Sequence, residues 1–387
     1  MDRVISPPPA KRRRLSSEST QQDGTIKRPR AASKPPPGTF RVYSWNINGF
    51  SPFLQTSLNS FFTSPSKSQA SPTEAPASLR AFLRRHEWPE ILCLQEIKIG
   101  RDDKQTLKAL KQAVKTKNGF NSGYAYEVFT TLPEDNFNAR GMGGKGRVYG
   151  VASIIRSNFY KQYVTDVRTV EWDAEGRFSI IELQDPVSKA KISIWNVYAV
   201  NGTSNEYRDS RTGEVVGTRH DRKLQVHRLM MEECMALEKD GWDVIIIGDL
   251  NVAPARIDGY PNLRTFPEQH MLNRADFNSR FLDPENGDGL RGVDIWRALH
   301  GQEKKYTWYS RNGPFGNSCD RVDLAIASRS LIEEERIVGC ETWNTEYERG
   351  PSDHVPISVT IKISNTDKIE QDEDTDTMKE NREAHQG

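Results

Sequence analysis

Six polar side chains that can bind metal ions or transfer protons adjoin short apolar segments of the chain. They are Asn46, Glu96, Tyr198, Asp249, Asp323 and His354. Mg²⁺ and Mn²⁺ prefer carboxylate and amide oxygens, a carboxylate can activate a water molecule, and an imidazole or a phenol can donate to a phosphate. Metal-assisted hydrolysis of a phosphodiester uses this combination of groups. The residue types therefore indicate a metal-dependent phosphodiesterase.

Each of these residues also has an ordinary structural interpretation. Asn46 is compatible with a turn, Glu96 with a surface charge, and His354 with a hydrogen-bonded loop histidine. Taken alone, each is more often structural than catalytic. Their joint occurrence at strand ends favours a site, because a core buries few such groups when each unpaired polar atom costs about 1–3 kcal/mol.

Other chemistries are disfavoured by what the chain lacks. Its four cysteines, Cys93, Cys234, Cys319 and Cys340, form no CxxC pair, which predicts free thiols in a reducing compartment and no zinc site. There is no GxxxxGK[ST] motif for nucleotide hydrolysis. The glycine-rich residues 138–146 are expected to form a mobile loop before a strand.

Short β-branched segments predict the strands that position these side chains. They cover residues 40–44, 91–94, 149–155, 191–198, 244–248, 322–327 and 354–359. Helices are expected at residues 78–86, 107–115 and 222–239, the last with an apolar face of Leu224, His227, Met231, Cys234 and Met235. The alternation predicts an α/β (α+β) fold, a four-layer α/β sandwich in which two packed mixed β-sheets are flanked by helices and polar strand ends meet at one edge.

Charge and composition separate the ends of the chain from the middle. Residues 1–38 carry nine Lys/Arg against three Asp/Glu and should be a disordered basic tail. Basic clusters at residues 11–14 and 27–30 have the spacing of a two-part nuclear import signal, with a phosphate-binding tail as the alternative. Residues 364–387, with three Lys/Arg against eight Asp/Glu, should be a disordered acidic tail. The catalytic domain is expected at residues 39–363, interrupted by a low-complexity insertion at residues 60–78.

Six motifs in order carry a resemblance to a known family. They are WNING at residues 45–49, LQEIK at 94–98, NVYAVNG at 196–202, GDLNVAP at 248–254, RVD at 321–323 and SDHVPI at 352–357. Together they resemble the exonuclease III-type abasic (AP) endonucleases of the endonuclease/exonuclease/phosphatase superfamily, which has a DNase I-like fold. The resemblance extends over about residues 39–363.

The resemblance implies a role for each matching residue. The metal ion, Mg²⁺ or Mn²⁺, would be bound chiefly by Glu96, and the residues expected near it are Asn46, Asp249, Asn251, Asp353 and His354. Asp249, assisted by Asn251, would activate the attacking water. His354, oriented by Asp323, would contact the scissile phosphate, and Tyr198 would donate to it. Substrate contacts are expected from Asn201, Trp308 and Arg321, with Asp258 in a supporting role.

One residue departs from the family pattern where substrate choice is decided. Abasic-site enzymes of this family commonly have a tryptophan where this chain has Asp320, although Trp308 fits their other aromatic position. A carboxylate supplies no apolar wall for a base-less sugar and repels phosphates. The expectation is thus a complete catalytic set with an altered pocket.

The function expected from these features is metal-dependent cleavage of DNA in base excision repair. The first choice is an apurinic/apyrimidinic endonuclease, with 3′-exonuclease or 3′-phosphodiesterase activity as an additional expectation, acting as a nuclear monomer on damaged double-stranded DNA and not at a membrane. Two alternatives stay open. One is another phosphoesterase of the superfamily acting on undamaged DNA, RNA or a non-nucleic phosphoester. The other is a non-catalytic DNA-binding scaffold, disfavoured because the metal and water positions are intact.

Overall fold

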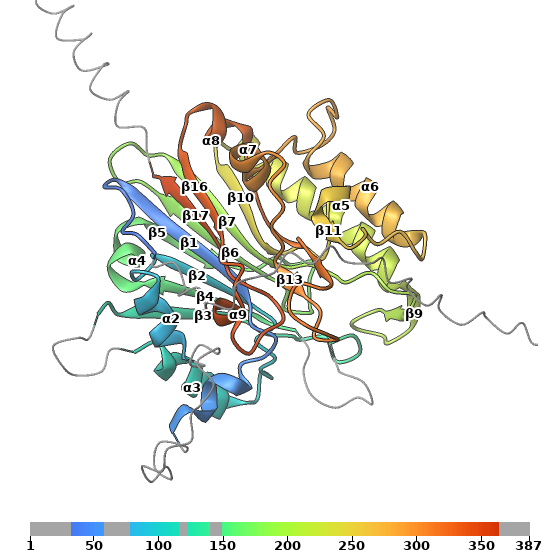
Figure 1. The fold of residues 1–387 in the computed structure, drawn as a ribbon, viewed down its shortest axis with the longest axis horizontal. Helices are drawn as coiled ribbons and strands as arrows, with labels where there is room; N and C mark the ends of the chain where they lie inside the picture. Colours follow the sequence, from blue (N-terminus) through green and yellow to red (C-terminus); the bar gives the residue numbers. More distant parts are fainter. Residues whose placement is uncertain (1–31, 58–77, 116–122, 140–148, 364–387) are drawn as a thin grey trace, which may run out of the picture.

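The computed structural model describes residues 32–57, 78–115, 123–139 and 149–363 (Figure 1). The basic tail up to residue 31, the insertion up to residue 77, most of the glycine-rich loop and the acidic tail lie outside these residues. Residues 32–38 contact the first strand, since the Arg41 guanidinium donates to the Ser33 carbonyl at 2.5 Å. Ser78, expected at the end of the insertion, caps a helix by accepting from the Ala81 amide.

Six strands form the first sheet, in the order β16-β17-β1-β2-β4-β3. They are β1 (Thr39–Asn46), β2 (Ile91–Gln95), β3 (Tyr126–Thr131), β4 (Val151–Arg156), β16 (Ile337–Thr342) and β17 (Ile357–Lys362). β1 and β2 are parallel, and the other neighbours are antiparallel. The first and last long strands of the described fold are therefore neighbours.

Six further strands form the second sheet, in the order β12-β15-β10-β7-β6-β5. They are β5 (Val164–Arg168), β6 (Phe178–Gln184), β7 (Lys191–Tyr198), β10 (Asp243–Asp249), β12 (Val293–Asp294) and β15 (Asp323–Ala327). β7 and β10 are parallel, and the other pairs are antiparallel. β10 is buried from Val244 to its end, as expected of a strand covered on both faces.

Helices cover the outer face of each sheet (Figure 1). The helices and 3-10 turns of the described residues are α2 (Leu79–Arg85), α3 (Lys104–Ala113), α4 (Ser157–Tyr163), α5 (Arg219–Lys239), α6 (Gln269–Phe281), α7 (Ile295–His300), α8 (Arg329–Glu333), α9 (Glu346–Arg349), η1 (Ser51–Ser57) and η3 (Arg256–Asp258). Helices α2 and α3 pack on the first sheet and α5 and α6 on the second, whereas α4, α7 and α8 contribute Phe159, Ile295 and Leu331 to the apolar cluster between the sheets. Phe82 of α2 packs in one cluster with Leu92 of β2, and Met230 of α5 in another with Ile246 of β10. The expected four-layer α/β sandwich is confirmed.

The interface between the sheets is apolar along most of its length and polar near the ends of β2 and β7. Val42, Ile194 and Ile245 belong to the apolar cluster between the sheets. The Gln95 side-chain amide donates to Asn196 Oδ1 at 2.8 Å, across the interface. Because this bond joins one strand of each sheet, it fixes how the two sheets meet beside the polar strand ends.

Helix α5 differs in detail from its sequence prediction. It begins at Arg219 rather than at residue 222, because Thr218 and Asp221 form a capping box. Leu224 and Met235 are only half-buried, and the buried apolar positions that the prediction omitted are Val226 and Met230.

Among the described residues, no helix combines the length and apolar character that a bilayer span needs.

Two small sheets complete the fold. β8 (Glu206–Arg208) pairs with β9 (Val215–Thr218), and β14 (Cys319–Asp320) lies between β11 (Gly259–Tyr260) and β13 (Trp308–Tyr309). The three-stranded sheet is joined to the loop before β17 by a bridge between Trp308 and His354. The three-stranded sheet therefore lies beside the polar strand ends.

All four cysteines are buried free thiols, as predicted.

Candidate active site

Strand pairing brings the polar strand ends to one edge of the sandwich. Asn46 ends β1 and Glu96 directly follows β2, and the carboxyl ends of these parallel strands are neighbours. Tyr198 and Asp249 end the parallel strands β7 and β10 and are paired in register. Asp323 begins the antiparallel strand β15 opposite Asp249. The predicted meeting of polar strand ends is thus observed.

The backbone turns sharply at these strand ends. Glu96 (φ 51°), Lys98 (φ 55°) and Asn251 (φ 52°) adopt the left-handed conformation although none is glycine. Such residues cost roughly 1–3 kcal/mol each and concentrate at functional sites. Gly248 (φ +148°) must be glycine, because a Cβ there would lie 2.0 Å from the Val197 carbonyl oxygen. That close approach of β7 and β10 immediately precedes Asp249.

The Asn46 side chain joins the two principal carboxylates. Its Nδ2 donates to Glu96 Oε1 at 3.0 Å and to Asp249 Oδ2 at 2.9 Å. The Asn251 amide donates to Asp249 Oδ1 at 2.9 Å. The Asp249 carboxylate is therefore held by one donor at the end of β1 and one in the loop after β10, which fixes the direction of its remaining lone pairs.

His354 lies between two aspartates. Its Nδ1 is 2.7 Å from Asp323 Oδ2, and its Nε2 is 3.9 Å from Asp249 Oδ2. The loop that carries it is tied down by Trp45 Nε1, which donates to the His354 carbonyl at 3.1 Å. Ser352 Oγ also accepts from the His354 amide at 3.0 Å. The ring is thus oriented with Nε2 toward the end of β10.

The surroundings shift the proton affinities of three of these groups. Burial alone would lower the pKa of His354, but the Asp323 and Asp249 carboxylates outweigh it and raise that pKa to about 10. Burial raises the pKa of Asp249, although His354 opposes the shift. Burial and the nearby Glu96 carboxylate raise the pKa of Tyr198 well above its ordinary value. Near neutral pH the site therefore offers an imidazolium and a phenol as donors, and a carboxylate with raised affinity for protons.

Glu96 is the carboxylate best placed to bind a divalent cation. Its side chain is 17% exposed, lines the cleft described below, and pairs with Lys98 Nζ at 3.0 Å. Oxygens of Asp249 and Asp323 and a ring nitrogen of His354 also lie within 4.8 Å of one another. That second group fits a hydrogen-bonded triad better than a metal site, because a protonated imidazole cannot be a ligand. The donor set around Glu96 and Asn46 fits a hard cation that keeps several waters.

Asp353 lies beside this group rather than in contact with Glu96. Its Oδ1 accepts from Asn48 Nδ2 at 2.8 Å and its Oδ2 from Trp308 Nε1 at 3.1 Å. Asn48 in turn accepts from Lys98 Nζ at 2.5 Å. A hydrogen-bonded chain therefore links Asp353 to the Glu96–Lys98 pair and also orients the Trp308 ring.

Several of these side chains line the floor of a cleft of about 720 Å³. Its lining includes Glu96, Tyr198, Asp249, Asn251, Asp353 and His354, together with the predicted substrate residues Asn201 and Trp308. Asp320 also faces the cleft, where it raises the pKa of Arg274, although burial lowers that pKa overall. The residue that departs from the family pattern is therefore a wall residue with a nearby guanidinium.

The substrate contact expected of Arg321 is not what the structure supports. Arg321 is buried, its Nε donates to Asp258 Oδ1 at 2.7 Å, and its Nη2 donates to Asp294 Oδ2 at 2.6 Å. Arg297 pairs with the same Asp258. Because its guanidinium is held by two carboxylates away from the cleft lining, Arg321 supports the strand that carries Asp323.

Several residues around the site had no role in the sequence prediction. Lys98 and Asn48 lie within the quoted motifs, and Lys223 of α5 donates to the carbonyls of Val200 and Asn251 at 2.9 and 3.0 Å. Behind Tyr198, buried charges of Glu175, Arg177 and Arg219 pack with Tyr149. In the sequence, Glu175, Gly176 and Arg177 precede a strand and resemble an exposed turn. Their burial beside Tyr198 could therefore not be predicted from the sequence.

Fold and site together define a class of protein. The chain matches the Endonuclease/Exonuclease/phosphatase family over residues 43–354 and belongs to that family. It is similar to mouse DNA-(apurinic or apyrimidinic site) endonuclease 2, with 25% identity over 347 residues that cover 84% of this chain and 60% of that protein. The human protein of the same name is 24% identical over the same length. The chain thus spans about 60% of the length of these curated relatives.

Solved structures support the same fold. The Xenopus laevis APE2 catalytic domain aligns with a TM-score of 0.53 at 22% identity, covering 83% of this chain and 91% of that one. An AP endonuclease from Leishmania major aligns with a TM-score of 0.55 at 19% identity, covering 84% and 88%. The family resemblance and the DNase I-like fold expected from the motifs are confirmed.

Proposed function

We propose that this chain hydrolyses phosphodiester bonds of DNA at abasic sites, with Mg²⁺ or Mn²⁺ as cofactor. The observation that carries the proposal is the arrangement in which Asn46 joins Glu96 to Asp249 while Asp323 orients His354 toward Asp249. This arrangement contains a cation ligand, a base and a charged donor at the floor of one cleft.

Asp249 is the group that activates water. Its carboxylate is buried and has a raised pKa, so it accepts a proton more readily than an exposed aspartate. Asn46 and Asn251 hold both of its oxygens, at 2.9 Å each, which leaves the carboxylate in one orientation. A fixed base loses little entropy when it meets the water.

His354 and Tyr198 stabilise the charge that develops on the phosphate. His354 is protonated because Asp323 and Asp249 raise its pKa, and its Nε2 is directed toward the base. Tyr198 keeps its proton because of burial and Glu96. Both donors are in place before the reaction, which is the condition for electrostatic catalysis.

The cation is assigned to Glu96, with Asn46 and Asp353 nearby. When bound, it would neutralise charge on the phosphate oxygens and on the leaving oxygen. Lys98, 3.0 Å from Glu96, adds a fixed positive charge on the same side. The oxygen-rich surroundings favour Mg²⁺ or Mn²⁺ over softer metals.

The relatives support DNA as the substrate. Their names specify apurinic or apyrimidinic sites, and the similarity covers most of this chain. We assign the enzyme to base excision repair in the nucleus, as a monomer acting on damaged duplexes. A 3′-exonuclease or 3′-phosphodiesterase activity is the second candidate, favoured by Asp320 in the cleft wall where an apolar side chain would fit a base-less sugar better.

One assay tests the proposal. Purified protein with Mg²⁺ is offered matched duplexes that carry an abasic site, a nick with a blocked 3′ end, or no lesion. Cleavage 5′ to the abasic site, abolished by Asp249→Asn, is expected. Absence of cleavage on every duplex, or an unchanged rate in Asp249→Asn, would contradict the proposed activity. Cleavage of the blocked nick alone would favour the 3′-exonuclease or 3′-phosphodiesterase activity instead.

A further inference from the structure

The wall of the cleft between β11 and α6 exposes large apolar side chains. We call residues 260–274 the cleft-wall segment. Phe266 is 85% exposed, more than any other large apolar side chain of the described residues, and Tyr260 is 48% exposed. Met271 and Leu272 are exposed as well. Scattered apolar residues are ordinary on surfaces, but several within one short segment mark a binding surface.

The same segment carries two arginines, Arg264 and Arg274, against one carboxylate, Glu268. The Arg264 guanidinium is exposed and makes no hydrogen bond or ion pair with the described residues, whereas Arg274 donates to the Ala253 and Arg264 carbonyls at 2.8 and 2.7 Å. Partial burial together with Arg264, His220, Lys223 and Arg274 lowers the pKa of His270 to about 4. The charged groups that lower this pKa are cations or imidazoles, and Asp320 of the same cleft acts on Arg274, so Arg264 is the cation of this wall that is open to an anion.

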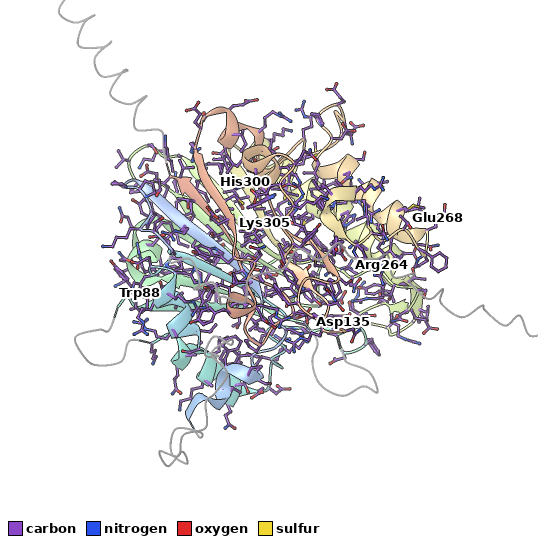
Figure 2. All side chains as sticks on the ribbon, in the orientation of Figure 1. Trp88, Asp135, Arg264, Glu268, His300 and Lys305 are labelled. Carbon is purple, nitrogen blue, oxygen red and sulfur yellow. The ribbon has the colours of Figure 1, made fainter. Side chains whose placement is uncertain are left out.

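The cleft-wall segment is continuous with the catalytic floor. Tyr260, Arg264, Phe266 and His270 line the same cleft as Asp249 and His354. Figure 2 places Arg264 and Glu268 on the side of the molecule that carries α5 and α6. A strand whose phosphate lies at His354 must therefore pass beside one of the cleft walls, and this wall offers aromatic rings and cations.

An exposed ring and a free guanidinium suit one kind of ligand. Aromatic side chains stack on bases, and arginines pair with phosphates, in proteins that bind unpaired nucleic acid. A base inside a continuous duplex has both faces covered by its neighbours. A base has a face free for Phe266 only where a neighbour is missing, as at a strand end, beside a gap or next to an abasic position.

We propose that the cleft-wall segment binds an unpaired nucleotide next to the cleavage site, with Phe266 stacked on its base and Arg264 paired with its phosphate. The inference rests on the proposed function and goes further by naming the substrate class, DNA with an unpaired nucleotide beside the scissile bond. Tyr260, which lies 6.2 Å from Tyr306 between ring centroids, provides a second aromatic surface at the same wall.

Binding of two labelled DNA probes tests this subsite without cleavage. Full-length protein in EDTA is titrated into a fully paired duplex and into the same duplex with one unpaired 2-aminopurine nucleotide at a gap. Phe266→Ala should weaken binding of the gapped probe by about 5- to 150-fold, the range for one lost stacking contact. Binding of the paired duplex should change less than about twofold. Stacking should also quench 2-aminopurine fluorescence in the wild type and not in Phe266→Ala.

Matched variants separate stacking from general damage. Phe266→Trp should retain the quenching and the affinity, because the indole also stacks. Val187→Ala, which removes another exposed apolar side chain (78% exposed) outside the cleft lining, should leave both unchanged. Arg264→Ala should reduce the slope of log affinity against log salt by about 0.7, as one phosphate contact to a single strand contributes.

The outcomes distinguish the subsite from the proposed function. Equal affinities of wild type and Phe266→Ala for the gapped probe would overturn the subsite, whether or not the wild type cleaves DNA. Binding that depends on Phe266, in a protein that cleaves none of the three duplexes of the activity assay, would support the subsite and contradict the proposed function.

Discussion

At the scale of single residues, Glu96 and Asp249 share one amide donor but are assigned different steps. Glu96→Gln should weaken cation binding, so that excess Mn²⁺ partly restores turnover. Asp249→Asn should remove the base and lower kcat by on the order of 10²-fold or more at every metal concentration. Rates measured across a Mn²⁺ titration check this difference. Equal rescue of both variants by the metal would contradict the assignment.

Arg177 is expected to matter for stability although it lies outside the cleft. Its guanidinium is 3.8 Å from the centre of the Tyr149 ring and 4.9 Å from that of Tyr198, and it pairs with the buried Glu175 at 3.1 Å. Arg177→Met leaves Glu175 with one partner fewer and should lower the free energy of unfolding by about 3–5 kcal/mol. Arg228→Met, at an ion pair with Glu232 in which both side chains are about half-exposed, should cost about 0–1 kcal/mol. Urea unfolding measures the free energy of unfolding of both variants. Equal decreases in the two would contradict a special role of Arg177 in stability.

The sequence indicated the residues of the candidate site more readily than the groups that support them. Asn46, Glu96 and Asp249 were recognisable because each is polar and directly follows or ends an apolar strand. Lys98 could not be distinguished from a solvated charge, since only the left-handed turn at Glu96 brings it back to the site. For Arg321, the motif shows the residue type but not the buried carboxylates that hold its guanidinium.

At the scale of elements, β14 carries the clearest prediction about the pocket. Asp320 on β14 lies opposite Trp308 on β13, and both line the cleft. Asp320→Trp should add apolar area for a base-less sugar and raise kcat/KM for abasic over intact DNA by roughly 5- to 150-fold, the value of one aromatic contact. Trp308→Ala should lower the same ratio. The ratio is measured from kcat/KM on abasic and intact duplexes at two salt concentrations. An unchanged ratio in both variants would show that these residues do not line the pocket for the sugar.

A buried histidine of helix α5, His227, should make the stability of the fold depend on pH. Burial lowers the pKa of His227 to about 4, although its Nδ1 is 2.8 Å from Asp276 Oδ2. The unfolded chain binds this proton near pH 6.5, so the neutral form stabilises the fold above that pH. The contribution, on the order of 3 kcal/mol, is lost as the pH falls from about 6.5 toward 4. Unfolding in urea at about pH 7.5 and pH 5 should show a smaller difference for His227→Leu than for the wild type, and an undiminished difference would exclude His227 as its source.

Central strands were easier to predict than edge strands. β7 and β10 are continuous apolar segments because both of their faces are covered, and they were found almost to the residue. β3, β5 and β16 lie at sheet edges, carry polar residues and were not predicted. β6 was also missed, because Ser179, Glu182 and Gln184 interrupt its apolar residues. In the structure Glu182 pairs with Arg168 of the edge strand β5.

At the scale of the whole molecule, the basic residues before Ala32 are expected to direct location and not catalysis. Deletion of residues 1–31 spares the Ser33 contact with Arg41 and should leave hydrolysis and urea unfolding unchanged. A fluorescent fusion of the shortened chain should spread into the cytoplasm, because both basic clusters are lost. Nuclear accumulation of that fusion equal to the full-length one would refute the import role.

The order of strands in the first sheet has a consequence for synthesis. β17, the last long strand of the described fold, inserts between β16 and β1, and Thr39 pairs with Lys362. During translation the ribosome releases Asn46, Glu96 and Asp249 long before His354 and β17. A nascent chain therefore holds the proposed cation ligands and the proposed base while it still lacks the proposed phosphate donor and a central strand. Nuclease activity should consequently arise in one step, once His354 and β17 have left the ribosome, so that shorter nascent chains do not cut nucleic acid.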